Sequence, residues 1–216
     1  MNDTVEYHLT ELSIARDRSH GSHVMPPIGS RYRRILDIGC GMGQTLIGLD
    51  LPADVEAYGV DPDAEAIEAG QRLVAPNIHL STGSGESLPF ADDFFDLAIC
   101  RVALPYMRVG AALSEMHRVL GPGGDVWLML HPVEMYTRRA WRSLSKGRVK
   151  DAIYCGYILF NGLLFSCVGK QVKFGRRMES CQTEFGMRRA LGRLGFEGVR
   201  LQRDPFFVAQ GSKRAR

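Results

Sequence analysis

The chain has 216 residues, of which 45% are hydrophobic and 24% charged, as in a single soluble globular domain. Its five cysteines are scattered and form no C-x-x-C pair, so we expect neither a structural metal nor a disulfide framework, and a reduced, cytoplasmic protein. The polar, acidic start MNDTVEYHLTEL lacks the charged and apolar regions of a secretory signal.

The net charge of +3 conceals a strong asymmetry along the chain. Residues 1–131 hold 9 Lys and Arg against 18 Asp and Glu, whereas residues 132–216 hold 18 against 6. The two halves are therefore expected to face different surroundings.

Apolar runs alternate with helical periodicity from about residue 31, which indicates a parallel sheet with helices on both faces. We expect strands at residues 33–38, 55–60, 77–82, 95–102 and 125–131. We expect helices at residues 45–51, 63–74 and 109–120, the last of them broken by GPGG at 121–124.

This alternation stops after His131 for about fifty residues and resumes with a helix at 183–196. Two strand-like runs follow, at 198–203 and 205–211, too close together for a crossover helix, so they must form an antiparallel hairpin. The predicted fold is α/β: Rossmann-like and doubly wound, with a mainly parallel seven-strand sheet, an antiparallel C-terminal hairpin and an insertion after the fifth strand. The predicted organisation is an N-terminal helical cover at 1–30, a cofactor-binding core at 31–131, the insertion at 132–182, and a C-terminal helix and hairpin of the same domain at 183–216.

Three glycines, Gly39, Gly41 and Gly43, lie in the stretch LDIGCGMGQT directly after the first predicted strand. A dinucleotide-binding fingerprint would need Gly or Ala at position 44, which is Gln44. A nucleotide-binding P-loop would need a lysine, and none occurs before Lys146. Both phosphate-binding interpretations are therefore disfavoured, and a turn with no ligand remains the structural alternative.

Two aspartates indicate another ligand. Asp61 ends the second strand, 20 residues after Gly41, where its carboxylate can accept from ribose hydroxyls. Asp37 precedes the glycine turn and can hold an ammonium group. A ribose, an amine and no phosphate indicate S-adenosylmethionine; the alternative for Asp61 is a cap on the following helix, for which Asp63 is as good a candidate.

Four stretches, ILDIGCGMGQT, YGVDPD, ESLPFADDFFDLAIC and MHRVLGPGGDVWLML, resemble successive motifs of class I S-adenosylmethionine-dependent methyltransferases. The resemblance is strongest to the branch that includes ubiquinone and menaquinone biosynthesis methyltransferases, and it covers roughly residues 33–131. It implies S-adenosylmethionine as the cofactor and methyl transfer as the reaction, and it leaves the acceptor open.

The resemblance also implies which residues meet the cofactor. These are Asp37, Gly39, Cys40, Gly41, Asp61, Pro62, Ser84, Gly85, Glu86, Cys100 and Arg101. The family commonly has an aspartate where this chain has Ser84, and an uncharged acceptor forms a weaker hydrogen bond to adenine, so cofactor affinity is expected to be modest. The alternative for Glu86 is a solvated loop charge, and for both cysteines a small core side chain.

His131, at the end of the fifth strand, is the candidate catalytic base, and Tyr106 and His131 are the candidate acceptor contacts. His8, His20 and His23 lie in the segment expected to cover the cofactor. The intact Asp37, glycines and Asp61 favour an enzyme over the alternative, a cofactor-binding scaffold or partner subunit without activity, to which only Ser84 points.

Residues 152–168 carry no charge and are flanked by basic stretches. Seventeen residues diluted by Gly, Asn and Ser are poorly suited to span a bilayer. In the resembled family this region is a lid over the acceptor pocket, so we expect a lid and an apolar or lipid-linked small-molecule acceptor. The basic flanks favour peripheral contact with anionic lipid; a buried lid helix and a homodimer contact remain alternatives. Nucleic acid is not expected, since no nucleic-acid-binding module is recognisable.

Overall fold

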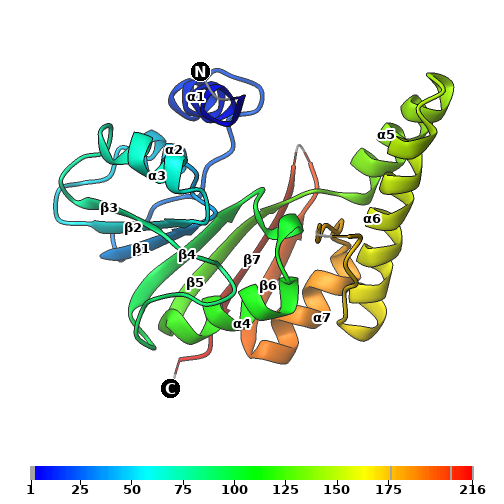
Figure 1. The fold of residues 1–216 in the computed structure, drawn as a ribbon. Coiled ribbons are helices and arrows are strands. Elements are labelled where there is room, and N and C mark those ends of the chain that lie inside the picture. Colours follow the sequence, from blue (N-terminus) through cyan, green and yellow to red (C-terminus); the bar gives the residue numbers. More distant parts are fainter. Residues whose placement is uncertain (1–2, 176, 205, 216) are drawn as a thin grey trace.

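A computed structural model describes residues 3–175, 177–204 and 206–215. Its centre is a seven-stranded sheet in the order β3-β2-β1-β4-β5-β7-β6, with helices on both faces (Figure 1). The strands are β1 Arg34–Ile38, β2 Glu56–Asp61, β3 Ile78–Thr82, β4 Phe95–Arg101, β5 Leu120–Leu130, β6 Phe196–Gln202 and β7 Phe207–Lys213. The first five pair in parallel, and β7 runs antiparallel to both β5 and β6, which confirms the predicted fold.

Eight helical segments complete the described chain. They are α1 Asp3–Arg16, α2 Gln44–Gly48, α3 Ala64–Gln71, the 3-10 turn η1 Leu104–Tyr106, α4 Val109–Val119, α5 Val133–Ser145, α6 Val149–Val168 and α7 Glu184–Leu194. Neighbouring residues of β1 pack into two different hydrophobic clusters, one on each face of the sheet, because successive side chains of a strand point to opposite faces. Leu36 packs in the cluster that contains Met116 of α4, and Ile35 in the cluster that contains Ile67 of α3.

One predicted boundary is wrong. The glycine-rich stretch after α4 is not a loop: β5 already starts at Leu120, which pairs with Phe95. The register shifts between Phe95 and Leu97, and a Cβ on Gly124 would lie 2.9 Å from the carbonyl oxygen of Gly121. The glycines therefore end the helix, as expected, but also allow an irregular start to the strand.

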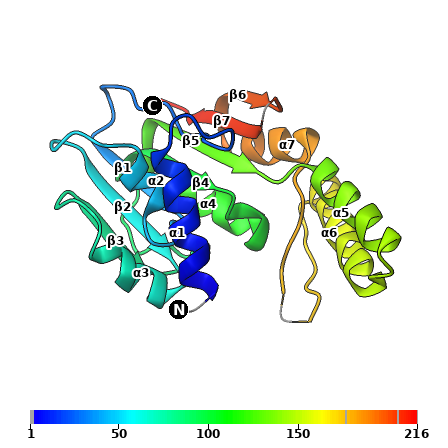
Figure 2. The ribbon, with the colours of Figure 1, turned by 90° about the horizontal axis from the view of Figure 1, so that it is seen from above.

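The insertion forms a hairpin of two helices, α5 and α6, which projects from the end of the sheet (Figures 1 and 2). Its two ends meet, since Pro132 bridges to Gln182 and the Gln182 amide donates to the His131 carbonyl at 3.1 Å. The segment that follows α6 is anchored beside η1, where the Ser180 amide donates to the Pro105 carbonyl at 3.0 Å. The insertion thus begins and ends at the carboxyl end of β5.

Candidate cofactor and acceptor site

The glycine turn follows β1 at the carboxyl edge of the parallel strands. Gly39, Gly41 and Gly43 have φ of 74°, 55° and 82°, a region that side chains disfavour. A Cβ on Gly39 would lie 2.2 Å from the Cβ of Ala103, and one on Gly41 would lie 2.5 Å from the His8 ring. Glycine is therefore required both by the backbone and by close packing at this turn.

Asp61, at the end of β2, fixes the position of this turn. Its Oδ2 accepts from the Gly41 amide at 2.8 Å, and its Oδ1 accepts from the Asp63 amide at 2.9 Å. The cap of α3 is Asp63, whose carboxylate accepts from the second and third amides after it. The alternative of Asp61 as the helix cap is thus wrong, and each Asp61 oxygen retains acceptor capacity for a ligand hydroxyl.

Asp37 lies beneath the turn, next to last in β1, with 1% of its surface exposed. Neither carboxylate oxygen has a hydrogen-bond partner among the described residues. Burial raises the pKa of Asp37 to about 7, against the opposing effects of the positive charge on Arg101 and of the Thr45 side chain. A buried carboxylate with so little compensation is costly, and a cationic ligand beside it would lower that cost.

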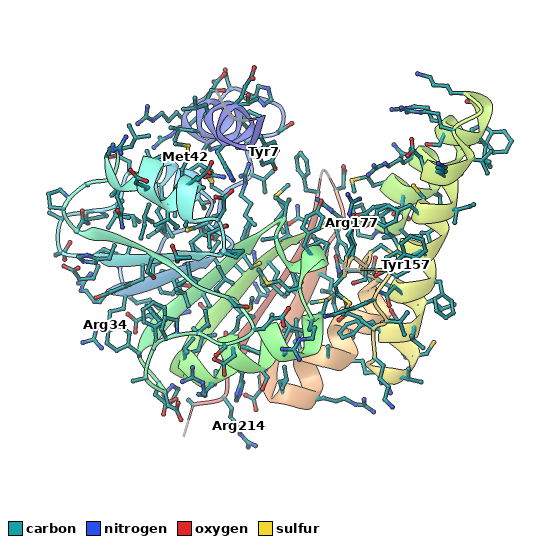
Figure 3. The ribbon with its side chains drawn as sticks, in the orientation of Figure 1. Tyr7, Arg34, Met42, Tyr157, Arg177 and Arg214 are labelled. Carbon is teal, nitrogen blue, oxygen red and sulfur yellow. The ribbon has the colours of Figure 1, made fainter. Side chains whose placement is uncertain are left out.

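Helix α1 lies across the carboxyl edge of the strands, over α2 (Figure 2). Arg101 at the end of β4 is buried, and its Nη2 donates to Oε2 of Glu11 on α1 at 3.1 Å. Its Nε is buried and has no partner among the described residues. Tyr7 lies on the underside of α1, toward the sheet (Figure 3). This helix therefore contributes side chains to the site.

Helix α1 and the strand ends enclose a cavity of about 180 Å³. It is lined by Tyr7, His8, Glu11, Gly39, Gln44, Thr45, Asp61, Arg101, Val102, Ala103 and Tyr106. Gly39, Asp61, Arg101 and Tyr106 are among the site residues predicted from the sequence, and His8 lies in the predicted covering segment. Gln44 is notable in the sequence only as a departure from a dinucleotide-binding motif.

The structure gives Gln44 a bridging position. Its Oε1 accepts from the Met42 amide at 3.0 Å, and its Nε2 lies 3.2 Å from Nδ1 of His8. Gln44 therefore joins the glycine turn to α1. Tyr7 and Glu11 were missed, because no local pattern in a polar helix indicates which of its faces will meet a distant strand end.

Eight of the eleven expected cofactor residues do not line this cavity: Asp37, Cys40, Gly41, Pro62, Ser84, Gly85, Glu86 and Cys100. Burial raises the thiol pKa of Cys40 and of Cys100, so both are protonated core residues rather than nucleophiles. Pro62 is exposed directly after Asp61.

The segment expected at adenine is held by its own contacts. Ser84 Oγ accepts from the Glu86 amide at 3.2 Å, and a Cβ on Gly85 would lie 2.6 Å from Cγ2 of Ile38. The Glu86 carboxylate accepts from the Arg108 amide at 2.8 Å and pairs with the Arg108 guanidinium. Glu86 thus secures the start of α4, and it is not the solvated loop charge of the alternative.

His131 follows β5 directly and packs edge to face against Tyr106, with 6.0 Å between ring centroids. It is therefore separated from the cavity by a residue that lines it. Its Nδ1 lies 3.1 Å from the hydroxyl of Tyr136, which in turn donates to Oε1 of Glu179 at 2.8 Å. The Tyr154 hydroxyl donates to the other Glu179 oxygen at 2.9 Å.

This arrangement sets the protonation of the imidazole. Because the Tyr136 hydroxyl gives its one proton to Glu179, its oxygen accepts from Nδ1–H of His131, and the lone pair is left on Nε2. Burial lowers the pKa of His131, with Glu179 acting in the opposite direction, so the ring is neutral near pH 7. Glu179 could not be found from sequence, because only the α5–α6 hairpin brings it back to β5.

Comparison with known proteins agrees with this geometry. Residues 35–124 match a family described as a methyltransferase domain. Over 103 residues the chain is 38% identical to an uncharacterized methyltransferase of Bacillus subtilis, YcgJ, covering 45% of this chain and 40% of the relative. It is 35% identical over 104 residues to a ubiquinone/menaquinone biosynthesis C-methyltransferase of Geotalea daltonii, covering 44% of each protein. The match thus spans less than half the length of these relatives.

A solved structure extends the likeness beyond the matched region. A S-adenosylmethionine-dependent methyltransferase of Methanosarcina mazei superposes with a TM-score of 0.60 at 19% identity, over 88% of this chain and 95% of the other. The fold, the glycine turn and the family match over residues 35–124 are those of a class I S-adenosylmethionine-dependent methyltransferase domain. Over less than half of its length, the chain is also similar to the ubiquinone and menaquinone biosynthesis C-methyltransferases.

S-adenosylmethionine is the cofactor that this family implies, and the residues present fit it. The Asp37 carboxylate would supply a counterion for the ammonium group, and Asp61 would supply oxygen acceptors for ribose hydroxyls. The buried Nε of Arg101, without a partner among the described residues, would be a donor for the ligand carboxylate.

Proposed function

We propose that the protein is an active methyltransferase that acts on a small, apolar or lipid-linked acceptor, at carbon or oxygen. The observation that carries the proposal is the buried Asp37, whose two oxygens have no partner among the described residues. A chain that never binds the cofactor would gain stability from replacing this residue, because a buried carboxylate with little compensation opposes folding. Retaining it is expected only if a cation binds there. Asp37 therefore supports binding of the cofactor, and methyl transfer is the reaction for which that cofactor is used.

Bound S-adenosylmethionine supplies an electrophilic methyl group on a sulfonium. The chain must then orient the cofactor, exclude water and remove a proton from the acceptor. In this proposal Asp37 and Asp61 orient the two polar ends of the cofactor. Helix α1, held by the buried Glu11–Arg101 pair, keeps water from the reacting centre.

His131 is the base in this proposal, through the lone pair on Nε2. Tyr136 and Glu179 hold the ring in that tautomer through the hydrogen bonds described above. A neutral imidazole is the form a base requires, and burial of His131 keeps it neutral. Tyr106 lines the cavity and packs against His131, so the acceptor is expected to lie against both side chains.

Two observations support an apolar acceptor. Tyr106, Val102 and Ala103 offer an aromatic and aliphatic surface at the cavity, and the insertion, whose end is anchored beside η1, is uncharged over residues 152–168. The relative from Geotalea daltonii is named a C-methyltransferase, which favours carbon as the acceptor atom. Cytoplasmic location belongs to the same proposal.

The test is transfer of a tritiated methyl group from S-adenosylmethionine to a lipid extract of the source cells. We expect label in an organic-phase product with the wild-type protein. His131→Gln should lose that product while it binds S-adenosylhomocysteine with unchanged affinity in calorimetry. Tyr136→Phe, the matched variant that keeps the ring but removes the hydroxyl, should lower the rate and shift its pH profile.

The outcomes separate the two candidate functions. Cofactor binding without labelled product in either phase would favour the scaffold. A product found only in the aqueous phase would retain the enzyme but overturn the apolar acceptor. Full activity of His131→Gln would remove His131 from the chemistry.

A further inference from the structure

The turn between α5 and α6 is a projecting, strongly basic feature, seen at the far end of the hairpin in Figure 1. We call residues 138–153 the hairpin tip. It carries six cations: Arg138, Arg139, Arg142, Lys146, Arg148 and Lys150. Its one carboxylate, Asp151, pairs with Arg148 at 3.4 Å. The tip therefore has a net charge of +5 within 16 residues.

Large apolar side chains are exposed among these cations. Trp141 is 76% exposed, and Leu144, Val149 and Ile153 are each more than half exposed. At an ordinary connection between two helices, such side chains are buried or the positions are occupied by polar residues. The reason is that exposing apolar surface to water is unfavourable. Trp together with Arg and Lys is the combination found where proteins meet lipid headgroups.

Helix α6 extends this apolar surface, because it carries apolar side chains on its outer face as well as Ile158 and Phe165 on its buried face. Phe160 and Leu163 are exposed, whereas Asn161 and Ser166 are buried. Asn161 Nδ2 donates to the Glu179 carbonyl at 2.9 Å, and its Oδ1 accepts from the Val172 amide at 2.8 Å. Polar and apolar contacts thus attach one face of α6 to its own chain, and further apolar side chains remain exposed on the outer face.

Among the described residues, α6 is the one helix long and apolar enough to cross a membrane by length and composition, and 33% of its most apolar window is buried. The contacts of Asn161 would be lost if α6 left the protein to span a bilayer. Lying on the surface of a membrane preserves them. The structure therefore fits a peripheral contact better than a spanning one.

We propose that the hairpin tip docks on an anionic lipid surface, with Trp141 and Leu144 among the headgroups and the cations on lipid phosphates. Charge complementarity selects this occupant. A second copy of the chain, packed tip to tip about a two-fold axis, would bring two clusters of net positive charge together. Anionic lipid instead neutralises them.

Docking would bring the site close to the membrane. His131 precedes α5 by two residues, and the 13 residues of α5 span about 20 Å at 1.5 Å per residue. An apolar molecule leaving the bilayer at the tip would therefore reach the acceptor site within one helix length. The surface proposal goes beyond the proposed function and stands without it, because lipid binding is measured without methyl transfer.

The experiment is sedimentation with vesicles of equal parts phosphatidylcholine and phosphatidylglycerol, against vesicles of phosphatidylcholine alone. We expect binding only to the anionic vesicles, falling as salt rises, because exposed charges are screened over about 8 Å at physiological ionic strength. Trp141 fluorescence should shift to shorter wavelength on binding, while Trp127, buried in the core, supplies an unchanged background measured in Trp141→Phe.

Substitutions then locate the surface. The triple variant Arg142→Ala, Lys146→Ala and Lys150→Ala should lose roughly a hundredfold in vesicle affinity, at about fivefold for each charge removed near the surface. A control with the same change of net charge, Arg188→Ala, Arg193→Ala and Arg200→Ala on α7 and β6, should lose less than about threefold, because these charges lie away from the tip. Both variants should bind S-adenosylhomocysteine like the wild type.

Three results would overturn the proposal. Equal loss in the two triple variants would mean non-specific attraction of a basic protein. Salt-resistant binding to neutral vesicles would mean insertion of α6. Absence of vesicle binding, with a dimer in light scattering that Trp141→Ser dissociates, would assign the tip to a second copy.

Discussion

Replacing Asp37 by asparagine should stabilise the protein without ligand and weaken its cofactor binding. The folded-state pKa of Asp37 is about 7, because the carboxyl is buried, whereas an aspartate in the unfolded chain titrates near 3.9. Between these pH values the folded state holds a proton that the unfolded state has lost. Stability therefore falls as pH rises from about 4 to 7.

The size of this effect follows from the shift. The pKa of Asp37 differs by about three units between the folded and unfolded states, and each unit corresponds to 1.36 kcal/mol. At pH 8, ionisation of this carboxyl therefore lowers the free energy of unfolding by at most about 4 kcal/mol. At pH 5 the folded carboxyl is already neutral, and only about 1.5 kcal/mol of that cost remains. An asparagine side chain does not titrate, so Asp37→Asn should be more stabilising at pH 8 than at pH 5 by about 2 to 3 kcal/mol.

Urea unfolding at the two pH values measures this difference. Any penalty for the buried amide cancels, because it is the same at pH 5 and pH 8. Asp63→Asn is the matched control: it exchanges one good helix cap for another on the surface of α3 and should give the same small effect at both pH values. A stability change in Asp37→Asn that does not depend on pH would refute the argument that Asp37 is an uncompensated buried carboxyl.

Calorimetry with S-adenosylhomocysteine completes the test, since that ligand carries the same ammonium group. Asp37→Asn should weaken binding at pH 8 by about 1.5 to 3 kcal/mol, the scale of a charge-assisted hydrogen bond. In the wild type, affinity should fall about tenfold from pH 8 to pH 6, as the carboxyl gains a proton. Unchanged affinity in the variant would place the ligand amine elsewhere.

Three further outcomes test the site. Asp61→Ala should weaken S-adenosylhomocysteine binding by roughly 1.5 to 3 kcal/mol in calorimetry; an unchanged dissociation constant would limit Asp61 to holding the Gly41 amide. Gly39→Ala should lower the thermal midpoint, with a cost of about 2 kcal/mol or more, because its φ is 74° and its Cβ would lie 2.2 Å from Ala103; a wild-type midpoint would contradict the packing. Glu11→Gln removes the carboxylate that pairs with the buried Arg101, and it should lower the free energy of unfolding in urea by about 1 to 3 kcal/mol. It should also make α1 more sensitive to limited proteolysis; wild-type protection would mean that α1 is held without this pair.

The amino-acid sequence by itself determined the fold class and much of the cofactor side. Periodicities of two and 3.6 residues placed strands and helices, because burial of apolar side chains acts on short windows of chain. The short separation of the last two strands required an antiparallel pair, now seen as β6 and β7. Asp37, Gly39 and Asp61 could be singled out because a strand end followed by a glycine turn is local in sequence.

Tertiary structure decided what depends on segments distant in the chain. Glu11 meets Arg101 across 90 residues, and Glu179 meets Tyr136 across 43, so no local pattern records either pair. The sequence also does not determine which side of α6 is buried. Its uncharged residues are equally compatible with a buried helix, a helix that faces a membrane, or a helix at a dimer interface. Asn161 is buried and Phe160 is exposed because the chain after α6 packs against one face of the helix, and only the tertiary structure shows which face that is.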